Sequence, residues 1–208
     1  MSLATEERAA LCDLFDEIGP NEPTLCTGWQ TRDLAAHLVI RERRADGAPG
    51  ILLKPLAGYT RRVQDSYARR PWRELVDLVR NGPAPWWPTR IPALDKAVNS
   101  IEFFIHHEDT RRGQAGWEPR KPDAERDAAL WAGLRRTSFL TLRRSPVGLV
   151  LHRPDGQEIV VKRAPESVTV SGEPGELLLF ATGRAAVRVE FDGDQQAIEA
   201  VQGFRRRL

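Results

Sequence analysis

The sequence has few of the features that mark membrane proteins or disulfide-rich secreted proteins. Its 208 residues include two cysteines, four histidines and one methionine. No apolar run approaches the roughly 20 residues that a membrane helix needs, and the acidic N-terminus lacks the apolar core of a signal peptide. Two cysteines, Cys12 and Cys26, are too few for a disulfide framework. These absences predict a cytoplasmic protein with two reduced, partly buried thiols.

The sequence also has little excess charge of either sign. Its 31 basic and 29 acidic residues give a net charge of +2. The basic residues are dispersed as arginine pairs with acids nearby, except for the terminal run Arg205–Arg207. Proteins that bind nucleic acid usually gather positive charge on one face, so we expect neither a nucleic-acid partner nor a membrane partner. The oligomeric state is left open by the sequence.

Up to about residue 143 the apolar residues follow a helical period. Pro71 and Pro122 are placed to open helices, and Gly113 is placed to close one. The last predicted helix of this half should turn Leu130, Leu134 and Leu140 inward. The predicted helices are one carrying Leu11 to Ile18, one from Gln30 or Thr31 past Arg41, and others over residues 52–68, 72–80, 92–112 and 122–142.

From Ser145 onward the pattern changes to period two with β-branched residues, which is typical of strands. We predict strands over residues 147–152, 157–162, 167–171 and 187–191, a short helix over 176–182 and a final helix over 194–206. The fold class is therefore a helical bundle plus an α+β unit, with domains at 1–143 and 144–208. A unit of about 60 residues has a small core, so the second domain is expected to dock on the first.

Three side chains in the helical half have the character of metal ligands. Glu102 and His106 are four residues apart, so they lie on one face of a helix. His37 lies between apolar neighbours on another predicted helix and can supply a third ligand. Two imidazoles and one carboxylate suit zinc, nickel, manganese or ferrous iron, and three protein ligands leave a position for water or substrate.

Each of these residues also has an ordinary interpretation. Glu and His four residues apart are common on solvated helix faces, and a single His in an apolar helix is often a hydrogen-bonded core residue. The surroundings of Glu102 favour the metal, because Ile101 and Phe103–Ile105 predict that this carboxylate is buried. A buried carboxylate without a partner is costly, and a metal ion would neutralise it.

Two sequence runs extend this interpretation through a family resemblance. The run Cys26–Leu38 contains a Trp, a helix start and Arg-Asp-Leu-x-x-His, and Glu102–Gly113 contains Glu-x-x-x-His followed by an acid, an Arg and a Gly. Both resemble the mycothiol-dependent maleylpyruvate isomerase group of the DinB/YfiT-like superfamily. The runs Ser171–Leu177 and Phe180–Arg184 resemble the sterol-carrier-like domain that accompanies it.

The resemblance implies a DinB-like four-helix bundle and a sterol-carrier-like α+β domain. It implies that His37, Glu102 and His106 bind a divalent metal, for which we expect zinc, and that mycothiol, a small thiol of actinobacteria, is the cosubstrate. Asp109 is expected to cap a neighbour or orient it, and Cys26 is not required as a ligand.

Arginines could bind an anionic substrate beside such a site. Arg41 follows His37 by one helical turn, and Arg184 comes from the second domain, so we assign both as candidate catalytic residues. Arg44 and Arg188 are more simply explained as solvated charges.

The sequence thus supports a metal- and mycothiol-dependent isomerase or thiol S-transferase that acts on a small anionic or electrophilic substrate. Three alternatives stay open. They are a metal-binding stress protein without catalysis, a metal-dependent hydrolase that uses bound water, and a small-ligand carrier that uses the second domain.

Overall fold

The computed structural model describes residues 2–47, 50 and 53–204, and for residues 92–98 it describes the backbone alone. The chain divides into two compact units, Met1–Trp117 and Glu118–Leu208. The first is helical and the second combines helices with a four-stranded sheet, so the fold belongs to the α+β class. None of the helices within the described residues combines the length and the apolar character that crossing a membrane requires.

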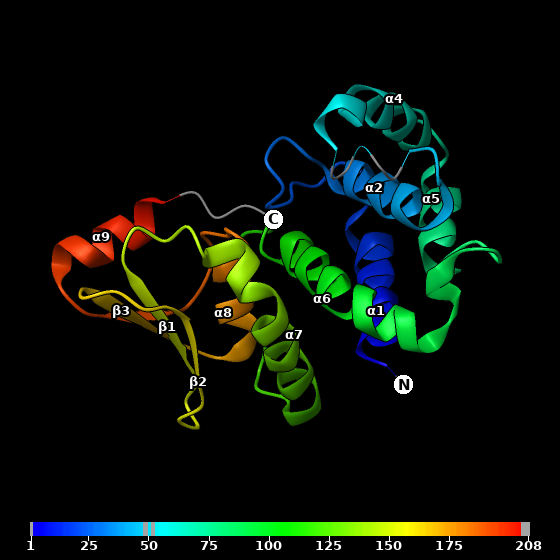
Figure 1. Ribbon diagram of the computed structural model, residues 1–208. Coiled ribbons are helices and arrows are strands. Elements are labelled where there is room, and N and C mark those ends of the chain that lie inside the picture. Colours follow the sequence, from blue (N-terminus) through cyan, green and yellow to red (C-terminus); the bar gives the residue numbers. More distant parts are fainter. Residues whose placement is uncertain (1, 48–49, 51–52, 205–208) are drawn as a thin grey trace. The chain divides into compact units, whose positions relative to one another are not determined.

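The first unit is a group of helices around one apolar core. Its elements are α1 (Leu3–Ile18), α2 (Thr31–Arg43), η1 (Lys54–Leu56), α4 (Ala57–Ala68), α5 (Trp72–Arg80), η2 (Pro88–Arg90) and α6 (Pro92–Arg111). Helices α1 and α6 lie side by side, and α2 packs against α4 and α5 (Figure 1). This arrangement brings three helices, α1, α2 and α6, around the polar residues described below.

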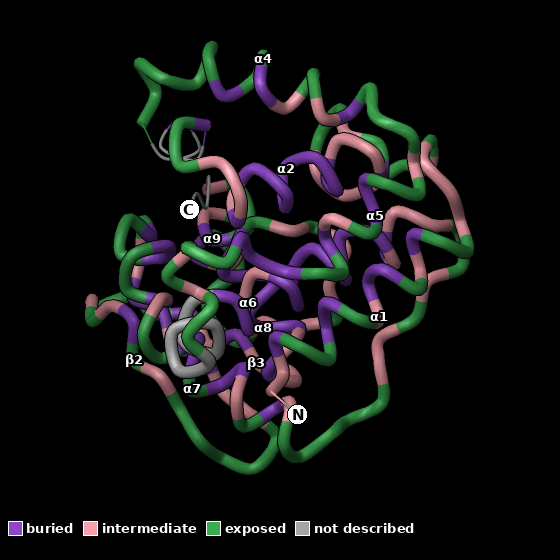
Figure 2. The backbone as a smooth tube through the Cα atoms, turned by 90° about the vertical axis from the view of Figure 1, so that its right-hand side faces the viewer, coloured by how far each residue is buried: buried purple, intermediate pink, exposed green. Residues whose placement is uncertain are grey.

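The helical spacing of apolar residues produces the core of the first unit. Leu11 and Phe15 on α1, and Leu34 and Leu38 on α2, are each four residues apart and fully buried. Burial of one such side chain contributes about 1.5–3 kcal/mol. Helix α4, by contrast, is exposed along most of its length, as Figure 2 shows. The core therefore lies among the other helices, with α4 as an outer cover on α2.

Local hydrogen bonds fix where α2 begins. The carboxylate of Asp33 accepts a hydrogen bond from the backbone N–H of Gln30 at 2.9 Å, which satisfies a donor that the helix cannot. The hydroxyl of Thr31 donates to the carbonyl of Gly19 at 2.6 Å and ties the helix start to the end of α1. Because the start is fixed, the rotation of α2 is fixed too, and His37 and Arg41 face α6.

The second unit combines a mixed sheet with three helices. Its elements are α7 (Ala124–Leu142), β1 (Gly148–His152), β2 (Glu158–Lys162), β3 (Ser167–Ser171), α8 (Pro174–Ala181), β4 (Glu190–Asp192) and α9 (Gln195–Gly203). The strand order is β2-β1-β3-β4, with β1 and β3 parallel and the outer pairs antiparallel. Helix α7 packs on α8 and β2, and α9 packs on β3.

The compact units do not divide at the predicted domain boundary between residues 143 and 144. They divide after Trp117, so α7 groups with the second unit. The physical reason is that α7 packs along α8, where Leu130 and Leu134 are fully buried. A helical period predicts that such a helix has a buried face, but it does not tell which partner covers that face.

Several predicted element details are corrected by the structure. Leu140 is 67% exposed, because it follows Leu134 by six residues and so lies about 240° around the helix. The strand predicted over residues 187–191 begins only at Glu190, since the N–H of Arg188 donates to the carboxylate of Glu176 at 2.7 Å.

Three predicted details reach residues outside the described part of the chain. The helix predicted over residues 52–68 starts at one of them, and its described part is the turn η1 followed by α4. The final helix predicted over residues 194–206 also ends beyond the described residues, and its described part is α9. The arginine run Arg205–Arg207 lies wholly outside them.

A close backbone approach after α6 gives a stability test. A Cβ atom on Gly113 would lie 2.3 Å from the carbonyl oxygen of Pro23 and 2.8 Å from Cα of Thr24. Gly113→Ala should therefore lower the free energy of unfolding by about 1–3 kcal/mol, measured by denaturant titration of the full chain. Gly58→Ala is the control, because a Cβ on Gly58 meets nothing within 4 Å. Equal stability of Gly113→Ala and wild type would contradict this packing.

Candidate metal centre

The three predicted ligands lie together between α2 and α6. The Nε2 atom of His37 is 3.7 Å from Oε1 of Glu102, and Nε2 of His106 is 3.3 Å from the same oxygen. The imidazole rings of the two histidines meet edge to face, with centroids 5.3 Å apart. One ligand atom from each of the three residues lies within 4.8 Å of the other two. Residues 65 positions apart in sequence thus converge on one point.

These separations match the size of a single metal ion. Nitrogen and oxygen ligands placed tetrahedrally at about 2.0–2.1 Å from zinc lie about 3.3 Å from one another. The two measured separations, 3.3 and 3.7 Å, are close to this value. The donor set also suits a divalent ion of the first transition row. Two of the three ligand separations therefore suit a single ion, and the third is no more than 4.8 Å.

The electrostatics favour the metal-binding forms of two of the three residues, Glu102 and His37. Burial alone would raise the pKa of Glu102, but hydrogen bonds from His106 and His37 hold it well below its usual value. Burial lowers the pKa of His37. An ionised carboxylate and a neutral imidazole are the forms that bind metals.

Glu102 is less buried than the sequence pattern predicts. Its side chain is 25% exposed, whereas those of His37 and His106 are about 10% exposed or less. Its apolar neighbour Phe103 fills the core, because adjacent residues on a helix point about 100° apart. The carboxylate is therefore partly buried, where the sequence pattern predicts a buried one.

Arg41 belongs to the cluster through its contact with Glu102. Its Nε atom lies 3.2 Å from Oε1 of Glu102, and its Nη1 atom donates to the side chain of Asn99. Asn99 in turn donates to Glu42 at 2.8 Å, and Glu42 forms a buried bidentate pair with Arg8. This chain of hydrogen bonds holds the guanidinium of Arg41 against the carboxylate.

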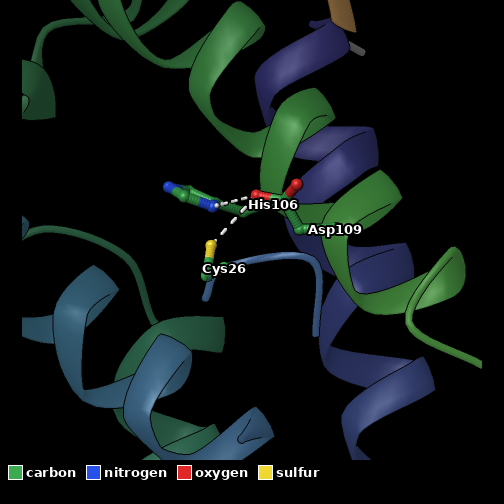
Figure 3. Close-up of side chains that lie close together, drawn as sticks. All are labelled: Cys26, His106 and Asp109. Carbon is green, nitrogen blue, oxygen red and sulfur yellow. Dashed lines mark hydrogen bonds and ion pairs between the residues drawn. The ribbon is translucent and has the colours of Figure 1, made fainter. Parts of the chain in front are cut away.

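Asp109 and Cys26 also belong to this region. Figure 3 shows that Asp109 and His106 come from α6, whereas Cys26 comes from the segment before α2. The Oδ2 atom of Asp109 is 3.0 Å from Nδ1 of His106 and 3.3 Å from Sγ of Cys26. These three residues form a second group in which one ligand atom from each lies within 4.8 Å of the others. The three-residue spacing of His106 and Asp109 indicates one helix face, but no sequence signal brings Cys26 there.

Asp109 and its other partners affect the protonation of His106. Burial alone would lower the pKa of His106, but hydrogen bonds with Asp109, Cys26 and Glu102 hold it well above its usual value. Without a metal the ring is therefore an imidazolium between two carboxylates. A metal at Nε2 must displace the proton there.

His107 has a different role from its neighbour. Its Nδ1 atom lies 2.7 Å from Oε2 of Glu7, and both side chains are buried. The contact joins α6 to α1, on a face away from His37 and Glu102. This direction agrees with the rotation of about 100° per residue in a helix.

A cavity of about 510 Å³ adjoins the cluster at His37. The indole of Trp29 forms part of its wall and packs on the imidazole of His37, with ring centroids 5.2 Å apart. Polar side chains dominate the rest of the wall. Among them are Thr27, Asp33, Thr60, Arg61 and Gln64. The cavity is large enough for a small polar molecule and offers one arginine for an anionic group.

Arg184, the other candidate catalytic residue, lies in the second unit. Its guanidinium donates to the carbonyl of Thr182 at 2.9 Å, and it borders a pocket of about 270 Å³ with Phe180 and Phe191. Trp86 and Trp87, in the first unit, form an edge-to-face pair before η2 and do not line the cavity beside His37.

Comparison with known proteins finds likeness in structure alone. No family model matches the chain, and no curated protein matches it. The chain is a two-part α+β protein. Its helical unit carries a His/His/carboxylate cluster that is a candidate metal site. Within the α+β class, the chain has the fold of mycothiol-dependent maleylpyruvate isomerase.

Two crystal structures carry this comparison. One is of a mutant of that isomerase, with a TM-score of 0.62 and 15% identity. The other is of the isomerase itself, with a TM-score of 0.57 and 13% identity. Each match covers 92% of this chain and 91% of the other. The family resemblance seen in the sequence is therefore confirmed for the fold.

The two cysteines should differ sharply in reactivity. Cys12 is fully buried, and burial raises its pKa to about 12, whereas Cys26 is half-buried. Because the thiolate is the reactive form, a thiol reagent at about pH 8 should modify one thiol in the native protein and two after denaturation. Mass spectrometry should place the native adduct on Cys26, and Cys26→Ala should remove it. Equal labelling of both thiols in the native state would contradict the burial of Cys12.

Proposed function

We propose that the protein binds a divalent metal and is a metal- and mycothiol-dependent isomerase or thiol S-transferase. The observation that carries the proposal is the convergence of His37, Glu102 and His106, with ligand atoms within 4.8 Å of one another. Three protein ligands leave a coordination position for an exogenous group, as in catalytic rather than structural sites. The cavity that adjoins His37 is large enough for a small molecule.

The chemistry divides between the ion and the chain. A bound divalent metal lowers the pKa of a thiol that coordinates it, so that the nucleophilic thiolate exists near neutral pH. His37, Glu102 and His106 would hold the ion. Arg41 balances the charge of Glu102, and Trp29 keeps the ring of His37 in place. In this proposal the thiol and the electrophile bind in the cavity beside His37.

The structural neighbours support the choice of thiol and reaction. Their names state that they are mycothiol-dependent and that they isomerise maleylpyruvate. For this chain we propose a small anionic or electrophilic substrate, with Arg41 and Arg184 as the catalytic arginines. Arg61, in the wall of the cavity, is a third cation that such a substrate could meet.

Finer assignments accompany this proposal. We propose that the helical part is a DinB-like four-helix bundle and that the remainder is a sterol-carrier-like domain. The proposed domain limits are 1–143 and 144–208, although α7 packs with the second compact unit. Zinc is the proposed metal, because imidazole and carboxylate donors suit it. A cytoplasmic location fits the free thiols of Cys12 and Cys26.

Removal of one ligand should abolish tight metal binding. For His37→Ala we expect the dissociation constant for zinc to rise more than about 100-fold. Loss of a residue that only hydrogen-bonds to a ligand weakens metal binding by about 10–100-fold, and loss of the ligand itself should weaken it more. Competition with a chromophoric chelator measures the dissociation constant. His107→Gln is the matched control, since His107 bonds to Glu7 and not to the cluster. Wild-type protein that binds no divalent ion would contradict the metal site.

A thiol titration tests what occupies the open position. In cobalt-substituted protein, mycothiol should add a thiolate-to-cobalt absorption band, because sulfur enters the coordination sphere. The disulfide form of mycothiol is the control, as it has no free thiol. Metal binding without any response to the thiol would reject the thiol-dependent reaction and favour a hydrolase that uses bound water.

A further inference from the structure

The carboxylate of Asp109 occupies a distinctive position behind His106. Asp109 is completely buried, and one of its oxygens lies within hydrogen-bond distance of two donors. These are Nδ1 of His106 at 3.0 Å and Sγ of Cys26 at 3.3 Å (Figure 3). The carboxylate of Asp109 therefore contacts both His106, a proposed metal ligand, and the thiol of Cys26, which is not a proposed ligand.

The contact with His106 decides which ring nitrogen can bind an ion. A carboxylate can only accept here, so Nδ1 of His106 carries the proton that it donates to Asp109. The lone pair available for a metal is then on Nε2, the atom that lies 3.3 Å from Glu102. Hydrogen-bonded carboxylates behind metal-bound histidines commonly fix the ring in this way.

The same residue ties the segment before α2 to α6. The backbone carbonyl of Asp109 accepts a hydrogen bond from the N–H of Leu25 at 2.9 Å, next to the thiol contact of Cys26. Three residues further on, Trp29 packs against the imidazole of His37 and lines the cavity. Asp109 thus contacts the proposed ligand His106 directly. It is connected to the second proposed ligand, His37, through the segment from Leu25 to Trp29.

We propose that Asp109 is a positioning residue that couples the metal centre to Cys26 and to the segment that forms the cavity wall. The inference rests on the proposed function, because it needs a metal at His37, Glu102 and His106. Its content is separate: metal loading and the state of the Cys26 thiol influence each other through one carboxylate oxygen.

A direct ligand role for Cys26, His106 and Asp109 is the competing arrangement. It would use Nδ1 of His106, which leaves the Nε2 face toward Glu102 and His37 without the metal. Hydrogen bonds explain the separations of 3.0 and 3.3 Å in this group. The cavity adjoins His37 and is lined by neither Cys26 nor Asp109, so an ion bound at this second group would lie away from it. The geometry therefore favours the positioning role.

Asp109→Asn provides the first test, since it keeps the shape of the side chain and removes its charge. We expect the dissociation constant for zinc to rise about 10–100-fold, the usual effect of losing a partner behind a ligand. Glu7→Gln is the matched control. It removes the charge from another buried carboxylate that contacts a histidine of α6, His107, and it should leave zinc affinity unchanged.

Spectroscopy separates positioning from general loss of stability. In the zinc-loaded wild type, ¹⁵N NMR of the His106 ring should show a proton on Nδ1 and the metal on Nε2, with weaker protection of that proton in Asp109→Asn. Metal on Nδ1, or a cobalt–thiolate band without added thiol that Cys26→Ser removes, would overturn the proposal. Unchanged zinc affinity in a folded Asp109→Asn variant would also overturn it.

The reverse coupling provides a second test. Zinc should slow alkylation of Cys26 in the wild type, because it fixes the Asp109 contacts, and this protection should largely disappear in Asp109→Asn. Protein alkylated at Cys26 should in turn bind zinc more weakly, because the adduct removes the thiol donor to Asp109. Zinc that binds the wild type without changing the alkylation rate would refute the coupling while leaving the metal site intact. Absence of zinc binding in the wild type would instead reject the proposed function.

Discussion

The helical unit depends on how the charge of Glu102 is balanced. This carboxylate lies where α6 meets α2, and a charge removed from water is costly unless it is paired. His106 meets it from the same helix, and His37 and Arg41 meet it from α2. Because these partners come from two helices, the pairing fixes the rotation of one helix against the other. The candidate metal site is a direct consequence of that rotation.

The polar interior extends well beyond this carboxylate. Arg41 is bound to Asn99, which is bound to Glu42, which is paired with Arg8 on α1. Arg41, Asn99, Glu42 and Arg8 each have a partner in this network, so the network costs less than its separate charges would. It also gives the three helices one relative arrangement, which an apolar core alone specifies less sharply. A site built on such a support is pre-organised, as binding a metal or orienting a thiol requires.

Much of the local structure could be predicted from sequence. The extents of α5 and α6 follow from apolar period, from Pro71 and from Gly113, and the first three strands follow from alternation. The cluster of His37, Glu102 and His106 was also predicted. Glu102 and His106 share one helix face, and the family resemblance implies His37 as the third ligand. Errors arose where a long-range contact overrides a local pattern, as where Glu176 captures the N–H of Arg188 before β4.

The sequence by itself determined the periodicities and the chemistry of the candidate ligands, since both depend on residue type and on spacing within one element. Only the tertiary structure decided which elements meet. It assigns α7 to the second unit, exposes one side of Glu102, and brings Cys26 to Asp109 across 83 positions of sequence. Contacts between distant segments depend on the packing of whole helices, and no spacing along the chain encodes them. Asp109 shows the difference most clearly: its position one turn after His106 is local, but its contact with the thiol exists only in the fold.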